Sequence, residues 1–278
     1  MFAILTWDGS SSGTRTGNIE TLNGVFAVGS DVWAVGDEGG TFRWKGSSWQ
    51  RIPSGTTEPL WSLWGSSGTD LWAVGPSGIV LHWDGSAWST RTAPVPTPRS
   101  ISGSGASSVW MVGGAGNISR FDGTSWIKEV SGTGSDLYAV WAVDASNVWA
   151  VGSAGTIVHR SGGKWQVESS GTSAGLLAVF GADLSNAYAV GEQGTILHRG
   201  ASSWSSETSG ALSRLWGVMG DSTGAVWAVG ASGQILRRTS GLWRSVASGT
   251  TNDLFQVYAR GSQVTTVGSG GTILFKAQ

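Results

Sequence analysis

The sequence predicts an all-β protein built from seven repeated units, and three observations support this fold class. A phrase of the form Val-Trp-Ala-Val-Gly recurs, with 38 or 39 residues between successive copies of its second position. Two glycines three residues apart follow in every unit, and no segment shows helical periodicity. A fixed period indicates a repeat architecture rather than separate domains. The second position of the phrase, here called the marker position, is held by Trp33, Trp72, Trp110, Trp149, Tyr188, Trp227 and Thr265.

Each unit has the pattern of four short strands. In the second unit we expect strands at 60–65, 71–75 and 79–83 and a fourth beginning at Trp88, because short runs rich in Val, Ile, Leu and Trp alternate with Gly, Ser and Asp. The Gly-x-x-Gly link predicts a tight hairpin, since glycine adopts positive φ without steric cost. Four antiparallel strands in each of seven units predict a seven-bladed β-propeller.

We expect a single domain over residues 1–278, closed into a ring by its two ends. Residues 2–17 have the pattern of a third and a fourth strand, whereas the last unit has only three strands. The fourth strand at 12–17 is therefore predicted to complete the C-terminal blade, which removes exposed sheet edges. Segments 3–7 and 272–276 compete for one third-strand position. We expect the C-terminal segment to hold it, with residues 1–7 peeled away or added at an edge, where a surplus strand offers a route to self-association. The predicted blades span about 21–54, 60–92, 98–131, 137–170, 176–208, 215–247, and 254–276 plus 12–17.

Composition excludes several classes of function. The formal net charge of −1 gives no reason to expect a nucleic-acid partner. The chain has no cysteine, which excludes disulfides and thiolate metal sites. No apolar run is long enough for a membrane helix, so no membrane insertion is expected. The first residues do not have the pattern of a signal peptide, although a segment cut from a longer precursor would begin in the same way.

The turns between the third and fourth strands carry a further motif. They read WDGSAW at 83–88, FDGTSW at 121–126 and WKGSSW at 44–49. This motif resembles the Asp-box, or bacterial-neuraminidase, repeat, in which Asp-x-Gly-x-x-Trp closes an outer hairpin of a propeller blade. The whole unit is also similar to the repeats of photosystem II assembly-factor propellers and of secreted bacterial seven-bladed propellers. The resemblance implies a place outside the cell or at the cell envelope. The aspartate position holds Asp8, Lys45, Asp84, Asp122, Ser161, Gly200 and Thr239, which favours a turn role over a catalytic one.

The resemblance makes a sialidase-type glycoside hydrolase the enzyme to consider, but no residue pattern supports catalysis. His82, His159 and His198 fall on outer strands of different blades, so they would not converge on a metal. One glutamate per blade, at positions 129, 168 and 207, suits a charged outer strand better than a catalytic carboxylate pair. We therefore predict no catalytic residue, metal or cofactor, and a protein that is not an enzyme.

A second outer column changes from aromatic to basic along the chain. Its members face a tryptophan five residues on, which would either close the hairpin or stack on a sugar. We interpret the aromatic and the arginine versions as two solutions to one structural problem. The column holds Trp44, Trp83, Phe121, Arg160, Arg199 and Arg238.

One inner column varies in residue type while its neighbours hardly change. It opens the first strand of each blade, and we expect it near the mouth of the central channel. Varied residues on a regular scaffold indicate ligand binding, with simple tolerance of substitution as the alternative. The column is Asn23, Trp61, Arg99, Tyr138, Leu177, Trp216 and Phe255. The predicted ligand-binding residues are Trp61, Arg99, Tyr138, Trp216 and Phe255, with Glu58, Asp136 and Asp253 in the adjoining loops.

Three hypotheses follow from these patterns. The first is a non-enzymatic, lectin-like propeller that binds carbohydrate, supported by the 18 tryptophans and by repeated sites that would give avidity. The alternative is a protein-interaction or assembly scaffold, so the expected partner is a glycan or a protein. The third is a glycoside hydrolase.

Overall fold

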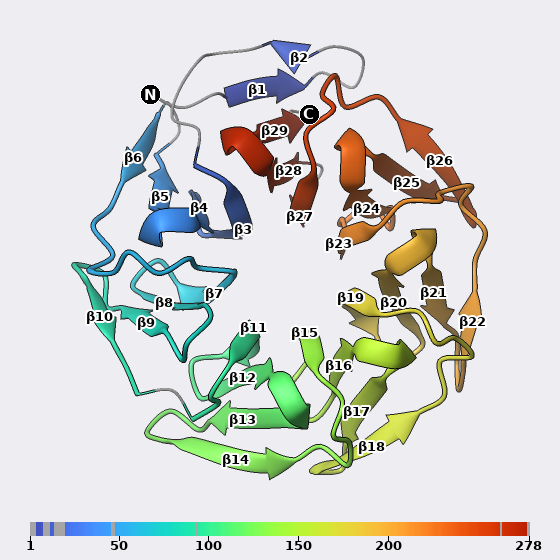
Figure 1. Cartoon of the computed structure of the whole chain (residues 1–278), viewed down its shortest axis with the longest axis horizontal. Coiled ribbons are helices and arrows are strands. Elements are labelled where there is room, and N and C mark those ends of the chain that lie inside the picture. The colour runs from blue at the N-terminus through green and yellow to red at the C-terminus, as the bar shows by residue number, and fades with distance from the viewer. Residues whose placement is uncertain are drawn as a thin grey trace.

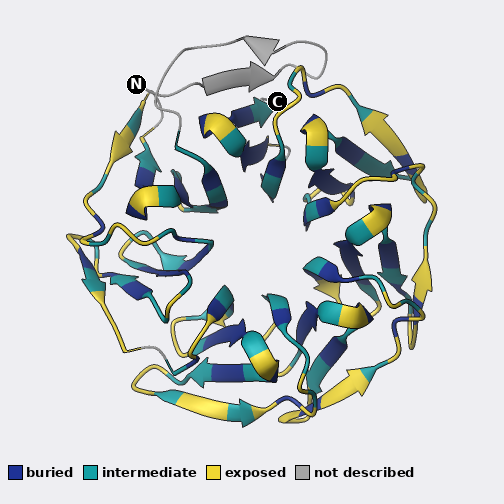
Figure 2. Cartoon of the chain, in the orientation of Figure 1, coloured by how far each residue is buried: buried dark blue, intermediate teal, exposed yellow. Residues whose placement is uncertain are grey.

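The computed structural model confirms an all-β, seven-bladed propeller. The structure describes residues 4–7, 12–13, 20–45, 48–92, 94–261 and 263–276. Six sheets of four antiparallel strands and one of five strands form a ring, with the first strand of each blade nearest the centre (Figure 1). Exposed residues gather on the outer strands, whereas the second and third strands are largely buried (Figure 2). The described part of the chain contains no helix whose length and apolar character would let it cross a membrane.

The blades are numbered in chain order, and their strands run from the centre outward. Blade 1 comprises β3 (Leu22–Val28), β4 (Asp31–Gly36), β5 (Thr41–Trp44) and β6 (Trp49–Arg51); blade 2, β7 (Ser62–Ser67), β8 (Asp70–Val74), β9 (Val80–Trp83) and β10 (Trp88–Thr90); blade 3, β11 (Pro98–Gly105), β12 (Ser108–Gly113), β13 (Asn117–Phe121) and β14 (Trp126–Val130); blade 4, β15 (Leu137–Ala142), β16 (Val148–Gly152), β17 (Ile157–Ser161) and β18 (Lys164–Glu168). Blade 5 comprises β19 (Leu176–Asp183), β20 (Asn186–Gly191), β21 (Ile196–Arg199) and β22 (Trp204–Ser206); blade 6, β23 (Leu215–Gly220), β24 (Val226–Gly230), β25 (Ile235–Thr239) and β26 (Leu242–Val246); and blade 7, β27 (Leu254–Arg260), β28 (Gln263–Gly268) and β29 (Ile273–Lys276), with β1 (Ile4–Trp7) and β2 (Ser12–Gly13) outside them.

The closing blade differs from the prediction in its outer strands. The C-terminal segment holds the third position as β29, as expected. The fourth position is taken by β1, which pairs parallel with β29, rather than by residues 12–17. β2 pairs antiparallel with β1 one position further out, and residues 14–17 lie outside the described residues. The N-terminal hairpin thus keeps its own local pairing and joins the sheet as a unit, which avoids separating two strands that are close in sequence.

Glycine is required at the two repeated positions for different physical reasons. In six blades the link between the second and third strands contains one short 3-10 turn. The second glycine has positive φ, as expected: Gly155 lies at 68°. The first glycine does not, since Gly152 has an extended φ of −167°. A Cβ on Gly152 would instead lie 1.8 Å from the carbonyl oxygen of Asp136. The turns are η1 (Asp37–Gly39), η2 (Gly114–Gly116), η3 (Ser153–Gly155), η4 (Glu192–Gly194), η5 (Ala231–Gly233) and η6 (Ser269–Gly271).

The marker side chains lie between neighbouring blades, and five of them are the largest fully buried side chains of the described residues. Trp149 is fully buried, and the ring of His159 on the adjacent strand stacks on it at 4.3 Å with an interplanar angle of 7°. The guanidinium carbon of Arg199, from the next blade, lies 5.4 Å from the centre of the same ring. His198 and Arg238 bracket Tyr188 in the same manner. The marker ring is therefore held by its own blade and by the next one.

The outer glutamates join consecutive blades instead of standing free on the edge. Glu168 accepts hydrogen bonds from Arg199 Nε (3.2 Å) and Nη2 (3.1 Å) and from Trp204 Nε1 (2.7 Å), all in the following blade. Glu129 and Glu207 make the same set of bonds to the blades that follow them. This explains the change from aromatic to arginine in the second outer column: each arginine there follows a blade that carries a glutamate, whereas Trp83 follows a blade with Ile52 at that place.

Replacing Glu168 with glutamine tests this contact between blades. Burial raises the pKa of Glu168, but hydrogen bonds from His159, Arg199 and Trp204 outweigh it and hold the pKa at about 2. Because this folded-state pKa lies below the ordinary value of 4.5, the carboxylate stabilises the fold above pH 4.5. That contribution is lost as the pH falls from 4.5 toward 2. We expect Glu168→Gln to lower the free energy of unfolding by about 1.5–3 kcal/mol at pH 7.

Urea unfolding of the wild type and of Glu168→Gln at pH 7, 4.5 and 3 checks this prediction, with the exposed neighbour Gln166→Ala as the control. The difference between the wild type and Glu168→Gln should shrink across the series. A difference that stays constant with pH would contradict an ionised Glu168.

Candidate functional site

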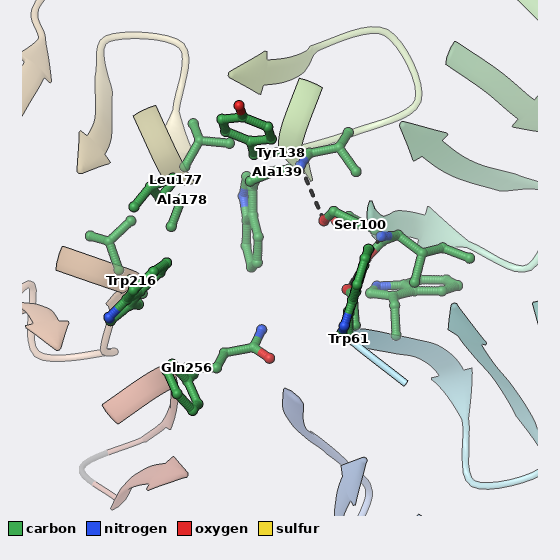
Figure 3. A pocket seen from close by; sticks show the side chains of 18 of the residues that line it. Trp61, Ser100, Tyr138, Ala139, Leu177, Ala178, Trp216 and Gln256 are labelled. Carbon is green, nitrogen blue, oxygen red and sulfur yellow. Dashed lines mark hydrogen bonds between the residues drawn. The ribbon is translucent and has the colours of Figure 1, made fainter. Parts of the chain in front are cut away.

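The variable inner column occupies an irregular point of each blade. In blade 4, Leu137 pairs with Gly152 and Ala139 with Val151, so Tyr138 is an extra residue in the ladder, as in a β-bulge. The inner strands of blades 1, 3, 5, 6 and 7 skip the column residue in the same way. A bulge re-aims the side chain of the extra residue. All seven column residues line the mouth of the central channel, where Figure 3 shows Trp61, Tyr138 and Trp216 around one opening.

The first of two clusters at the mouth comes from blades 2, 3 and 4. The guanidinium carbon of Arg99 lies 5.4 Å from the ring centre of Trp61 and 5.3 Å from that of Tyr138. The side chain of Arg99 is 38% exposed. Its nearest acid is Asp136, at 3.9 Å between Nη2 and Oδ2, which is too long for a hydrogen bond. The guanidinium therefore keeps donors for a ligand while two rings hold it in place.

The second cluster comes from blades 6 and 7. The rings of Trp216 and Phe255 meet edge to face, with centroids 5.8 Å apart and an interplanar angle of 78°. Arg214 lies over Trp216 at 5.2 Å and donates to Glu192 Oε1 at 2.9 Å. Leu177 of blade 5 and Asn23 of blade 1 separate the two clusters around the ring. The mouth thus presents two aromatic surfaces, each with an arginine, on opposite sides of one opening.

Below the mouth the residue after the variable column is small in six of the seven blades, which lets neighbouring inner strands lie close together: a Cβ on Gly217 would lie 3.0 Å from Gln256 Cα. The two serines among them accept hydrogen bonds from the inner strand of the next blade: Ile101 N–H donates to Ser62 Oγ at 3.3 Å, and Val140 N–H donates to Ser100 Oγ at 3.3 Å (Figure 3). The one large residue at this level is Gln256 of blade 7, whose Oε1 accepts a hydrogen bond from Val25 N–H at 2.9 Å across the closing interface. The remaining cavity is about 140 Å³, below the roughly 300–1,000 Å³ of small-molecule pockets. A ligand would therefore lie across the mouth instead of inside the channel. The residues that directly follow the variable column are Gly24, Ser62, Ser100, Ala139, Ala178, Gly217 and Gln256.

The three acidic residues predicted beside the site do not line the channel. Asp136 Oδ1 accepts from Ala115 N–H at 2.8 Å, and Asp253 Oδ1 accepts from Ser232 N–H at 2.8 Å. Both donors belong to the 3-10 turn of the preceding blade, so these carboxylates join neighbouring blades. Glu58 is exposed on its loop, where its own N–H donates to Thr56 Oγ1. The structure brings together Trp61, Arg99, Tyr138, Trp216 and Phe255 at the mouth, with Asp136 near Arg99 alone.

The side chains of the outer turns and the outer-strand tryptophans make hydrogen bonds within the protein. Hydrogen bonds from the N–H of Ala87 and from the hydroxyl and N–H of Ser86 hold the pKa of Asp84 at about 2, so this aspartate is an ionised turn residue. Trp165, Trp204 and Trp243 are at most 9% exposed, and each donates to a glutamate. His159 and His198 stack on marker rings, and His82 lies against Trp72 at a tilt of 34°, each in a different blade. Within the described ranges, no three His, Asp or Glu side chains gather closely enough to hold a metal ion.

Comparison with known proteins places the chain by its fold. No protein-family model matches it, and no curated protein matches its sequence, so the Asp-box resemblance stays a prediction. Among solved structures it is similar to YCF48 from Cyanidioschyzon merolae, at 18% identity and a TM-score of 0.76, over 93% of this chain and 96% of that one. A structure of YCF48 bound to D1 peptide gives 19% identity and a TM-score of 0.76, over 95% and 94% of the chains. The WD40 β-propeller domain of Doa1 gives 14% identity and a TM-score of 0.83, over 97% of each. At these identities the likeness shows the seven-bladed propeller fold.

Proposed function

We propose that this chain is a non-enzymatic propeller that binds a segment of another protein across the mouth of its channel. The observation that supports this most is the pair of clusters at the mouth, Trp61–Arg99–Tyr138 and Trp216–Phe255 with Arg214. Tryptophan, tyrosine and arginine are the side chains that contribute most at protein interfaces. They are supplied here from the start of the inner strands, where the paired sheet on either side fixes the backbone, so the site is formed before the ligand arrives.

The chemistry of the two clusters indicates the kind of segment. Opposed aromatic surfaces suit an extended peptide with apolar side chains toward both clusters. Arg99 and Arg214 suit a backbone carbonyl or an acidic side chain between them. The similar structure of YCF48 carries a D1 peptide, which supports a peptide ligand for this fold. We propose that the partner is a flexible or terminal peptide segment.

The carbohydrate-binding interpretation has less support. Sugar stacking on the outer strands would need tryptophans whose rings are exposed. The rings of Trp204 and Trp243 are largely buried, and their Nε1 groups already donate to glutamates. The similar structures give it no support. The hydrolase hypothesis also has little support, because Glu129, Glu168 and Glu207 each accept hydrogen bonds from an arginine and a tryptophan.

Selection from a random peptide library, with a glycan array in parallel, tests the ligand class. We expect the wild type to enrich a peptide family with apolar residues on either side of an acidic or polar one. Binding should fall at least about 30-fold in Trp61→Ala/Trp216→Ala, because an anchoring aromatic side chain contributes about 2 kcal/mol or more. The control Val167→Ala/Leu242→Ala removes two exposed apolar side chains from outer strands and should bind as the wild type does.

Two results would overturn the proposal. One is glycan binding without peptide enrichment, which would restore the lectin hypothesis. The other is an enriched peptide that binds the double mouth variant as tightly as the wild type, which would move the site away from the mouth.

A further inference from the structure

The closing interface between blades 7 and 1 lacks an aromatic ring that the other six interfaces contain. The residues at the marker position of blades 1 to 6 are five tryptophans and one tyrosine, each at most 3% exposed. In blade 7 the position holds Thr265. Thr265 pairs with Tyr258 on one side and with Phe275 on the other, which is the register that the marker residues have in other blades. The strand geometry is therefore maintained while the ring is missing.

The other wall of this interface also keeps its usual spacing. In blade 4, Trp141 Nε1 donates to the carbonyl of Gly181 in blade 5 at 2.9 Å, and a Cβ on Gly181 would lie 3.1 Å from the ring of Trp149. At the closing interface Tyr258 hydroxyl donates to the carbonyl of Ala27 at 3.0 Å. Ala27 is thus the counterpart of Gly181, and the blades have not moved together to fill the space.

A cavity of about 380 Å³ lies at this place. Its walls are Thr265 itself and the surrounding residues Ala27, Val32, Tyr258 and Phe275. Tyr258 and Phe275 pair with Thr265 as Trp141 and His159 pair with Trp149 in blade 4. Its edge is formed by Ser30 and Asp31 of blade 1 and by Arg260, Gly261 and Gln263 of blade 7, and both Ser30 and Arg260 are exposed. The cavity therefore has aliphatic and aromatic side chains in its wall, together with the hydroxyl-bearing Thr265, and its polar edge is reachable from solvent.

We propose that this cavity binds a planar aromatic ring of about the size of indole. The six equivalent positions all hold such a ring between the same strand positions. Its volume falls within the range of roughly 300–1,000 Å³ found for small-molecule pockets. The site lies between blades 7 and 1 and shares only Tyr258 with the lining of the channel, so it does not depend on the proposed function. The ring belongs either to a free small molecule or to a side chain of a partner protein.

Binding of 5-fluoroindole, followed by ¹⁹F NMR titration, tests the proposal. The wild type should bind one equivalent, and Thr265→Trp should weaken binding at least tenfold, because its own side chain fills the cavity. Thr266→Val, which alters the neighbour on the opposite face of the strand, should bind as the wild type does. Ala27→Leu fills the cavity from blade 1 and gives a second test if Thr265→Trp does not fold.

A parallel titration with N-acetyltryptophan amide distinguishes the two sources of the ring. Binding of the amide as tight as that of 5-fluoroindole supports a partner side chain, whereas binding of 5-fluoroindole alone supports a small molecule. Absence of 5-fluoroindole binding to the wild type at millimolar concentration would overturn the proposal. Equal binding by the wild type and both filled variants would also overturn it.

Discussion

Gly152→Ala should destabilise the protein by about 3 kcal/mol or more, although it adds only one methyl group. The new Cβ would lie 1.8 Å from Asp136 O, 2.8 Å from Asp136 C and 2.9 Å from Leu137 Cα. All three atoms belong to the backbone, so no side chain can rotate away to relieve the contact. Relief requires the loop into blade 4 to move, which would break the hydrogen bond from Ser153 N–H to Asp136 O at 2.9 Å.

Thermal and urea unfolding of Gly152→Ala measure this effect, with Gly134→Ala as the matched control. Gly134 lies on the loop into blade 4, two residues before Asp136, has nothing within 4 Å of its added Cβ and does not have positive φ. The control should unfold as the wild type does, while Gly152→Ala should lose about 6–12 °C in Tm. Similar stability of the two variants would contradict close backbone approach as the reason for the first repeated glycine.

Trp149→Ala is expected to cost about 3–5 kcal/mol, because it removes a fully buried ring from between two blades. It takes away the stacking surface of His159 and the ring beneath Arg199. Trp149 Nε1 has no hydrogen-bond partner among the described residues, so the loss is one of packing. Trp149→Tyr should cost far less, since Tyr188 performs the same role in the next blade.

Urea unfolding of both variants, monitored by circular dichroism, separates the two expectations. A loss for Trp149→Tyr equal to that for Trp149→Ala would show that the indole itself, rather than any flat ring, is required at the marker position. That result would also weaken the argument that an aromatic ring is what the closing interface lacks.

The repeat spacing predicts most of the fold, because each unit carries its own strand pattern and turn residues. The marker column gives the second strands, and the variable column gives the residues that line the mouth. Two interpretations drawn from the pattern of a single unit were wrong. The outer glutamates bond to the following blade, and the first glycine is needed for close approach instead of positive φ. Both depend on contacts between units, which a pattern within one unit does not contain.

The sequence predicted that the variable column lies at the channel mouth, but it did not predict the local backbone geometry there. The alternation of a regular strand does not indicate that Tyr138 is an extra residue in its ladder. The sequence signal was the position of the column, at the point where each loop enters the first strand. The roles of Asp136 and Asp253 were not predictable, because their partners lie in the preceding blade. The outer strands of the closing blade were not predictable from the repeat pattern, because β1 keeps its pairing with β2 and joins β29 as the fourth strand.

The most direct test of peptide binding at the channel mouth is photo-crosslinking of the tightest selected peptide, with benzophenone at successive positions and the products mapped by mass spectrometry. We predict crosslinks to the residues that open the inner strands, Trp61, Tyr138, Trp216 and their neighbours, on both sides of the opening. Crosslinks confined to the outer strands, such as β14 or β18, would contradict binding at the mouth.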